Sequence, residues 1–290
     1  MIIASAVVSG LSLGAMYGLI ALGFHVTYVV SNTVNFSQGS SVMIGAVLGY
    51  AFAVRLGWPL PMAVLAALVC CALLGVLIER ALVRPFTERG SNAWLMATVA
   101  GGIVLDNVVL FTFGKEPRSF PSALAAKPID IFGVGVFPLQ IVIPLVGLGI
   151  AAALWLATRG TRQGKALLAV VQNSDAARLM GIDVKRMIVA TYALSTALAG
   201  LAGMLIAPLY NVHSDMGALF GIKAFAVAIL GGITSAPGVM AAGIMYGVGE
   251  ALVTALFGST YTQIAMFAIV IAALALMPNG LFGRAPVKKV

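Results

Sequence analysis

Three ionisable side chains, Asp106, Lys223 and Glu250, fall inside long apolar runs of the sequence. A charge in an apolar layer is costly, so such groups are typical of substrate, ion or proton pathways. Asp106 lies about 12 Å from the end of its predicted helix at 1.5 Å per residue, which predicts a deep position. Lys223 stands near the outer end of a short run, where its flexible stem lets the ammonium reach water. Glu250 falls in mid-helix among small residues, within reach of a neighbouring backbone. We take Asp106 and Glu250 as candidate residues of a path across an apolar layer.

A polar break interrupts two apolar runs at residues 34–41, which read Val-Asn-Phe-Ser-Gln-Gly-Ser-Ser. If this break lies at membrane depth, its free amides and carbonyls need partners, and a polar substrate can supply them. The N-terminus of the following helix carries partial positive charge, which suits a carboxylate. An ordinary surface turn with Asn35 or Ser37 as helix cap explains the same residues. The candidate path residues in this break are Asn35, Phe36, Gln38 and Gly39.

A second break follows at residues 230–238, which read Leu-Gly-Gly-Ile-Thr-Ser-Ala-Pro-Gly. Gly231 and Gly232 permit unusual backbone dihedrals, and Pro237 suits a first helical turn. Two interrupted apolar segments, one in each half of a chain, point to a central binding path. A tight surface hairpin would produce the same pattern. Gly231 and Gly232 are therefore further candidate path residues.

The other residue types give no sign of covalent or metal chemistry. Nothing near His25 or His213 in the sequence completes a metal site or a catalytic triad. Cys70 and Cys71 are adjacent, which disfavours a mutual disulfide and is not metal-ligand spacing. An intramembrane hydrolase needs a Ser–His pair or paired aspartates within the spans, and none is evident. We predict no catalytic residue, no metal ligand and no cofactor.

The elements that must position these residues are membrane-spanning helices. The chain has 290 residues, of which 61% are hydrophobic and 9% charged, whereas soluble proteins are about a quarter charged. A span needs about 20 apolar residues, so we expect an all-α polytopic membrane protein of eight or nine helices in one domain over residues 1–290. The run at 222–233 is too short to cross alone, so at least one span is short or broken. The apolar runs are 2–30, 39–54, 61–78, 94–113, 138–157, 187–209, 222–233, 238–257 and 261–277.

Basic loops orient the chain. The net charge of +8 comes from residues between apolar runs, which is the orientation signal of membrane proteins and argues against nucleic acid as a partner. We place residues 79–89, residues 159–186 and the tail with Arg284, Lys288 and Lys289 in the cytosol. Residues 115–137 are longer, mixed in charge and rich in proline, so we place them outside. The N-terminus then lies outside if residues 2–30 cross once.

Residues 159–186 hold six of the 17 basic residues and the makings of two short helices. An apolar stripe is expected from Ala166, Leu167, Val170 and Val171. Asn173 or Ser174 suits the cap of a second helix, and Gly181 suits its end. Residues 160–166 echo a phosphate loop, but they have one residue too few between the glycines and no Ser or Thr after the lysine. We expect no ATPase in this chain, and a partner that docks on this organised loop.

The ordered motifs of the chain resemble the permease subunits of ATP-binding-cassette importers for branched-chain amino acids, in particular the H-type partner of the paired permeases. The similarity covers nearly the whole sequence. It runs through residues 10–23, 35–39, 164–182, 199–203, 223–238, 250–251 and 278–284.

The resemblance implies a multi-pass subunit of the bacterial inner membrane, in contact with lipid, that translocates solute and is not itself an enzyme. It implies a second permease in a heterodimer, two ATP-binding subunits and an extracytoplasmic substrate-binding protein. Residues 159–186 become the coupling loop that docks on an ATP-binding subunit. The positions that match the family in this loop are Gly164, Asn173, Ala176, Ala177 and Gly181.

The chain departs from the family pattern at several positions. Relatives usually show Asn-Phe-Ala-His-Gly-Glu where residues 35–40 read Asn-Phe-Ser-Gln-Gly-Ser. Asp106 stands where an amide is common, and Leu168 replaces a frequent arginine. The expected substrates therefore extend from branched-chain amino acids to related small amino acids and amides. The alternative function is an ion- or proton-coupled secondary transporter or channel, with Asp106 and Glu250 as carriers and no ATPase partner.

Overall fold

The computed structural model describes residues 2–131 and 134–283. Within them, seven helical segments are long and apolar enough to cross a membrane. They are α1 (Ile2–Ser31), α3 (Leu60–Ile78) continued by η2 (Glu79–Val83) and α4 (Arg84–Thr87), α5 (Trp94–Phe113), α7 (Pro138–Gly160), α10 (Val184–Ile206), α12 (Ala236–Phe257) and α13 (Ser259–Leu276). Two shorter apolar segments are α11 (Met216–Leu230) and α2 (Gln38–Tyr50), which η1 (Ala51–Arg55) extends. The predicted all-α polytopic fold with a short span is confirmed.

Helix α1 is the central element, and glycine lets its neighbours approach it. It packs against α12, α10, α7 and α11, and its run of small residues explains the fit. A Cβ atom built on Gly14 would lie 2.6 Å from the Gly243 carbonyl oxygen of α12, and one on Gly10 would lie 2.6 Å from the Val248 Cα. Small residues four apart drive helix association in lipid, where apolar side chains gain little from leaving the solvent.

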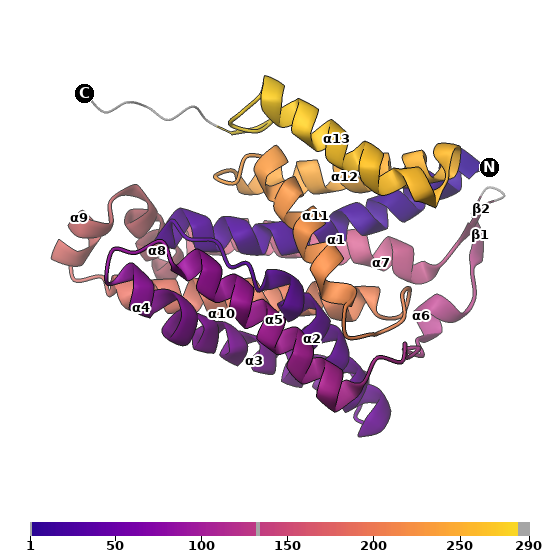
Figure 1. Ribbon diagram of the computed structural model, residues 1–290, viewed down its shortest axis with the longest axis horizontal. Coiled ribbons are helices and arrows are strands. Elements are labelled where there is room, and N and C mark those ends of the chain that lie inside the picture. Colours follow the sequence, from indigo (N-terminus) through magenta and orange to yellow (C-terminus); the bar gives the residue numbers. More distant parts are fainter. Residues whose placement is uncertain (1, 132–133, 284–290) are drawn as a thin grey trace.

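The two ends of the bundle carry different segments (Figure 1). Helices α4, α8 (Arg162–Gln172) and α9 (Ser174–Leu179) lie at one end, and the first residues of α1 lie at the other with α6 (Ala123–Ala126). The positive charge of the loops predicts that the α8–α9 end lies in the cytosol. In that orientation, the first residues of α1 lie outside. The tail cations Arg284, Lys288 and Lys289 lie outside the described residues.

The outer loop is more ordered than an irregular connection. It contains α6 and an antiparallel hairpin of β1 (Ile129–Ile131) and β2 (Val134–Val136), in which Ile129 pairs with Val136. Arg118 and Val212 form an isolated bridge that joins this loop to the segment before α11. The sequence analysis missed the hairpin, because its two three-residue strands are too short to show a period of two.

Helix α11 runs across the bundle rather than along it. In Figure 1 it crosses steeply over α1, while α12 and α13 follow the long axis. It contacts α1, α2 and α12. One short helix therefore connects the segment before α2 to the turn before α12, which are the two breaks of the sequence.

Candidate substrate path and coupling surface

The first break is buried inside the bundle. Helix α1 ends at Ser31, Asn32 adopts a left-handed backbone conformation with φ 54°, and α2 begins at Gln38. The side chains of Asn35 and Ser37 are 0% exposed, as is that of Gln38. The surface-turn interpretation of residues 34–41 is therefore wrong. Irregular backbone at this depth is stable only where protein or a water-filled cavity covers it.

Side chains within the break and on α10 satisfy its polar groups. The Asn35 Oδ1 accepts from the Ser37 backbone N–H at 3.1 Å and from the Ser37 hydroxyl at 2.6 Å. The Gln38 amide donates to the Ser195 carbonyl oxygen at 3.0 Å, and the Ser195 hydroxyl donates back to it at 3.1 Å. Ser37 occupies the N-cap position of α2 without a capping hydrogen bond from its side chain. This bonding fixes the break to α10.

Two further helices close around the break. On α5, the Thr98 hydroxyl accepts from the Phe36 N–H at 3.4 Å. On α11, the ring of Phe225 lies edge-on to that of Phe36 with centroids 5.2 Å apart. A Cβ atom built on Gly39 would lie 2.6 Å from the Gly217 carbonyl oxygen. Gly39 is thus a site of close backbone contact, and any side chain there would push α2 from α11.

The structure brings Asp106 to this break. Asp106 follows Thr98 and Gly102 at intervals of four residues, so all three lie on one face of α5. The Ser40 hydroxyl donates to the Gly102 carbonyl oxygen at 3.2 Å and lies close to the Asp106 carboxylate. Among the described residues, the buried Oδ1 of Asp106 has no hydrogen-bond partner. A buried carboxylate oxygen without a donor can accept a hydrogen bond from an ammonium group or from water, or it can bind a proton.

Glu250 occupies a different cluster. Its carboxylate accepts from the Lys223 ammonium at 2.5 Å and from the Tyr17 hydroxyl at 2.9 Å, joining α12 to α11 and α1. The Lys223 side chain is only 8% exposed. The prediction that Lys223 extends to water is therefore wrong, because its charge is neutralised inside the bundle. Glu250 likewise meets side chains rather than a neighbouring backbone.

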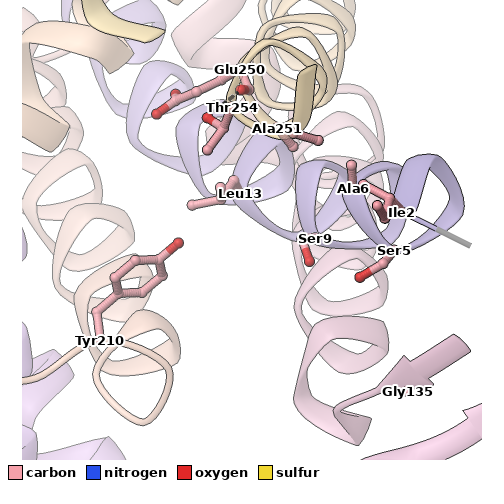
Figure 2. A pocket seen from close by; sticks show the side chains of 11 residues that line it. Ile2, Ser5, Ala6, Ser9, Leu13, Gly135, Tyr210, Glu250, Ala251 and Thr254 are labelled. Carbon is pink, nitrogen blue, oxygen red and sulfur yellow. Dashed lines mark hydrogen bonds between the residues drawn. The ribbon is translucent and has the colours of Figure 1, made fainter. Parts of the chain in front are cut away.

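An open cavity of about 670 Å³ lies beside Glu250 at the outer end of the bundle. Figure 2 shows Glu250 and Thr254 of α12 on one side of it, with Tyr210 across from them. Ser5 and Ser9 of α1 add hydroxyl groups to its wall. The lining thus mixes apolar surface with a few hydroxyls and one neutralised carboxylate, a surface that suits a small amphipathic solute.

The second break forms a hairpin at the other end of α11. Gly232 has φ 80°, and the Ser235 side chain caps α12 by accepting from the Gly238 N–H at 3.2 Å. Leu281 donates its N–H to the Leu230 carbonyl at 2.7 Å, which fastens the hairpin to the C-terminal segment. A Cβ atom on Gly231 would lie 2.6 Å from the Gly238 carbonyl oxygen. The two predicted breaks are therefore linked through α11, with Gly231 packed against the start of α12 and Gly232 against Gly283 of the C-terminal segment.

Helices α8 and α9 form the predicted pair in the cytosolic loop. The Thr161 side chain caps α8, and the Asn173 Oδ1 accepts from the N–H groups of Asp175 and Ala176 at 3.1 and 3.0 Å. Gly181 has φ 83° and follows the end of α9. The predicted cap at Asn173 and the predicted helix end at Gly181 are both present.

One face of the pair is anchored to the bundle. Val170 and Ala177 are buried with Val30 of α1 and Val184 of α10. Gly164 is buried too, because a Cβ atom there would lie 2.5 Å from the Thr158 Cα of α7. Ala176, by contrast, is exposed. Most of the family positions in the loop thus shape the pair, and Ala176 lies on its free surface.

Large apolar side chains on this free surface were missed by the sequence analysis. Leu179 is 90% exposed and Met180 is 82% exposed at the end of α9. Leu168 and Val171 of α8 are also exposed, so of the predicted apolar stripe Val170 is buried and Val171 faces outward. Exposed apolar groups of this size on a water-facing element indicate a protein contact. The signal was present in the sequence as Leu-Met next to a helix-ending glycine.

Comparisons with known proteins place these features in a family. A family model described as "Branched-chain amino acid transport system / permease component" matches residues 6–274. The high-affinity branched-chain amino acid transport system permease protein LivH of Escherichia coli strain K12 is 32% identical over 97% of this chain and 96% of its own length. The corresponding protein BraD of Pseudomonas aeruginosa is 32% identical over 98% of this chain and 96% of its own.

A solved structure supports the fold. PsaBC from Streptococcus pneumoniae in complex with Fab contains a chain that aligns with a TM-score of 0.51 at 14% sequence identity. The alignment covers 93% of this chain and 91% of that one. The sequence matches, which extend over nearly the whole chain, decide the assignment: this chain belongs to the family of permease components of branched-chain amino acid transport systems.

Proposed function

We propose that this chain is a substrate-translocating subunit of an ATP-binding-cassette importer of the bacterial inner membrane. Its substrates are branched-chain amino acids or related small amino acids and amides. It works with a second permease, two ATP-binding subunits that hydrolyse ATP, and an extracytoplasmic binding protein. The observation that carries this proposal is the anchored α8–α9 pair with its exposed Leu179 and Met180, in a chain that matches importer permeases over nearly its whole length.

The contacts supply a mechanical route from the coupling loop to the candidate path. Pressure on α9 passes through Gly181 and the Asp183 cap into α10, whose N-terminal turn receives that cap. Ser195, three turns further along α10, is bonded to Gln38. A rigid shift of α10 therefore moves the buried break, and packed helices switch between discrete arrangements rather than deform continuously.

The substrate path lies along the flank of α5 that carries Asp106. The break with Asn35, Phe36, Gln38 and Gly39 forms its wall, and the free Asp106 oxygen accepts the substrate ammonium. Glu250 takes part through the outer cavity, where the solute enters. Gly231 and Gly232 form the turn that joins α11 to α12, so a tilt of α11 with the break would be passed on to α12 through this turn.

The proposal is tested by changing the exposed surface of α9 and measuring two things: binding of the ATP-binding subunits and ATP-dependent uptake of leucine. Leu179→Ser combined with Met180→Ser should abolish copurification of the ATP-binding subunits and reduce ATP-dependent leucine uptake into vesicles at least tenfold. Leu56→Ser removes a 59% exposed leucine near the end of η1, at the outer end of the bundle, and should leave both unchanged. Uptake that persists without nucleotide or ATPase subunits, and follows an imposed pH or ion gradient, would instead establish a secondary transporter.

A further inference from the structure

A groove of about 410 Å³ lies at the cytosolic end of the bundle, and its mouth includes the last residues of the 159–186 loop but none of α8 or α9. One wall is α3 with its extensions η2 and α4, and the other is the first half of α10. The two walls pack directly on each other, as α10 contacts both α3 and η2. The lining residues are Val76, Arg80, Arg84, Asp183, Lys185, Arg186, Val189, Ala190 and Ala193.

The groove changes character along its length. Its membrane-ward part is apolar and small, with Val76 on one wall and Val189, Ala190 and Ala193 on the other. Its cytosolic part carries four cations and one carboxylate. Residues 186, 189, 190 and 193 are spaced at three, four and seven positions, so one face of α10 supplies both parts. The apolar part of the groove could accommodate an acyl chain, and the cationic part could contact the headgroup of the same lipid.

Three of the four cations are held in place by acids. The Arg84 guanidinium donates two hydrogen bonds to the Glu79 carboxylate at 3.0 and 2.8 Å. Glu79 is 3% exposed, so this two-bond ion pair is held rigidly.

The other two ion pairs lie at the mouth. Lys185 donates to Glu88 at 2.7 Å and lowers the pKa of Glu88, and Arg186 lies 2.8 Å from Asp183. These two pairs are exposed, and such pairs contribute about 0–1 kcal/mol, so a stronger anion can rearrange them.

Arg80 is the unbalanced charge of the groove. Within residues 2–131 and 134–283 it has no ion pair, while Glu79, Glu88 and Asp183 balance the other three cations. Arg80 is exposed and stands one helical turn before Arg84, on the same wall. A monoanion placed between Arg80 and the mouth of the groove would therefore neutralise the local excess.

We propose that this groove binds an anionic phospholipid from the cytosolic leaflet. The phosphate contacts Arg80 and the mouth cations, and one acyl chain lies against the small residues of α10. Anionic lipids concentrate at the cytosolic surface, and basic pockets between spanning helices at this level bind their headgroups. Charge complementarity selects the headgroup, and the apolar part of the groove selects a lipid over a free phosphate ion. The lipid site does not depend on the proposed transport function, although Asp183 at its mouth also belongs to the proposed coupling route.

Native mass spectrometry of the full chain in detergent tests the proposal. The protein is titrated with dioleoyl phosphatidylglycerol and, separately, with dioleoyl phosphatidylcholine. Each basic residue near a membrane surface contributes about fivefold to the binding of an anionic lipid. Arg80→Gln should therefore weaken phosphatidylglycerol binding about fivefold and leave phosphatidylcholine unchanged. Arg89→Gln removes a cation of the same loop that does not line the groove, and it should have no effect.

A variant that should strengthen binding separates a loss of charge from a loss of structure, because a misfolded protein would only bind more weakly. Asp183→Asn removes the one carboxylate of the lining but retains an oxygen to cap α10, so it should tighten phosphatidylglycerol binding about fivefold. Equal binding of both lipids, or equal effects of Arg80→Gln and Arg89→Gln, would overturn the proposal. So would displacement of the lipid by millimolar inorganic phosphate, which would identify a site for the free ion. Loss of binding in complexes that retain ATP-binding subunits would assign the groove to a protein contact.

Discussion

At the scale of single residues, the sequence revealed which groups are unusual but not which groups they meet. Asp106, Lys223 and Glu250 stood out because charges are rare in apolar runs. The partner of Glu250 could not be predicted, because Lys223 and Tyr17 come from helices far away in the sequence. The same argument holds for Gln38 and Ser195, which are 157 residues apart. A pattern along one chain reports depth and polarity, whereas pairing depends on how the helices pack.

The buried Asp106 oxygen gives a test at this scale. Asp106→Asn retains the size of the side chain but removes the charge that would attract a substrate ammonium. A hydrogen bond to a charged group contributes about 1.5–3 kcal/mol, so we expect the KM for leucine uptake by the complete transporter to rise at least tenfold. Asn107→Ala is the matched control, because its amide donates to the Ile103 carbonyl of its own helix. Equal uptake by Asp106→Asn and the unchanged protein would assign Asp106 to packing.

At the scale of elements, local rules worked where local chemistry decides the structure. Asn173, Gly181 and Pro237 were identified from capping and turn preferences, and each sits where those preferences place it. The break before α2 was located by its polar residues, but its burial depends on α5, α10 and α11 closing over it. The π-helical extensions η1 and η2 were not predicted: the charged residues Glu79 and Arg80 mark the start of η2 as the end of an apolar run, but they do not indicate a change in helix type.

The end of α9 allows an element-scale prediction. Gly181 has φ 83°, with nothing within 4 Å of an added Cβ atom, so Gly181→Val strains the backbone without a collision. A left-handed conformation costs a residue with a side chain about 1–2 kcal/mol, and relief of that strain reorients α9. We expect ATP-dependent uptake to fall several-fold while the amount of inserted protein stays constant.

Gly258 supplies the matched control for that experiment. It has φ 85° and equally open surroundings, but it joins α12 to α13 at the outer end of the bundle. Its ψ is 163°, a backbone conformation that is almost restricted to glycine, so Gly258→Val also imposes backbone strain, but far from the coupling pair. Uptake that falls equally in both variants would show a general loss of stability, and the role of α9 in coupling would be rejected.

At the scale of the whole molecule, the exposed sides of the bundle differ in chemistry. The exposed large side chains of α3 and of α7 between residues 141 and 148 are apolar, as a lipid contact requires. Helix α5 also exposes apolar groups, but Asp106 and Asn107 interrupt them. Ionisable groups in spans face protein or a water-filled cavity. The Asp106 flank of α5 is therefore the side on which we expect the second permease, and the path between the two subunits would run along it.

Cysteine cross-linking in native membranes checks this arrangement. Ile103 is 59% exposed and precedes Asp106 by three residues, so it lies on the same flank of α5, whereas Leu145 of α7 is 66% exposed on an apolar side. In a background with Cys70→Ser and Cys71→Ser, Ile103→Cys should cross-link to the other permease with a short bifunctional maleimide. Leu145→Cys, which faces lipid in this arrangement, should react only with a membrane-soluble maleimide. Cross-linking through Leu145→Cys but not Ile103→Cys would move the partner to α7, and Asp106 would then need a water-filled cavity within this subunit.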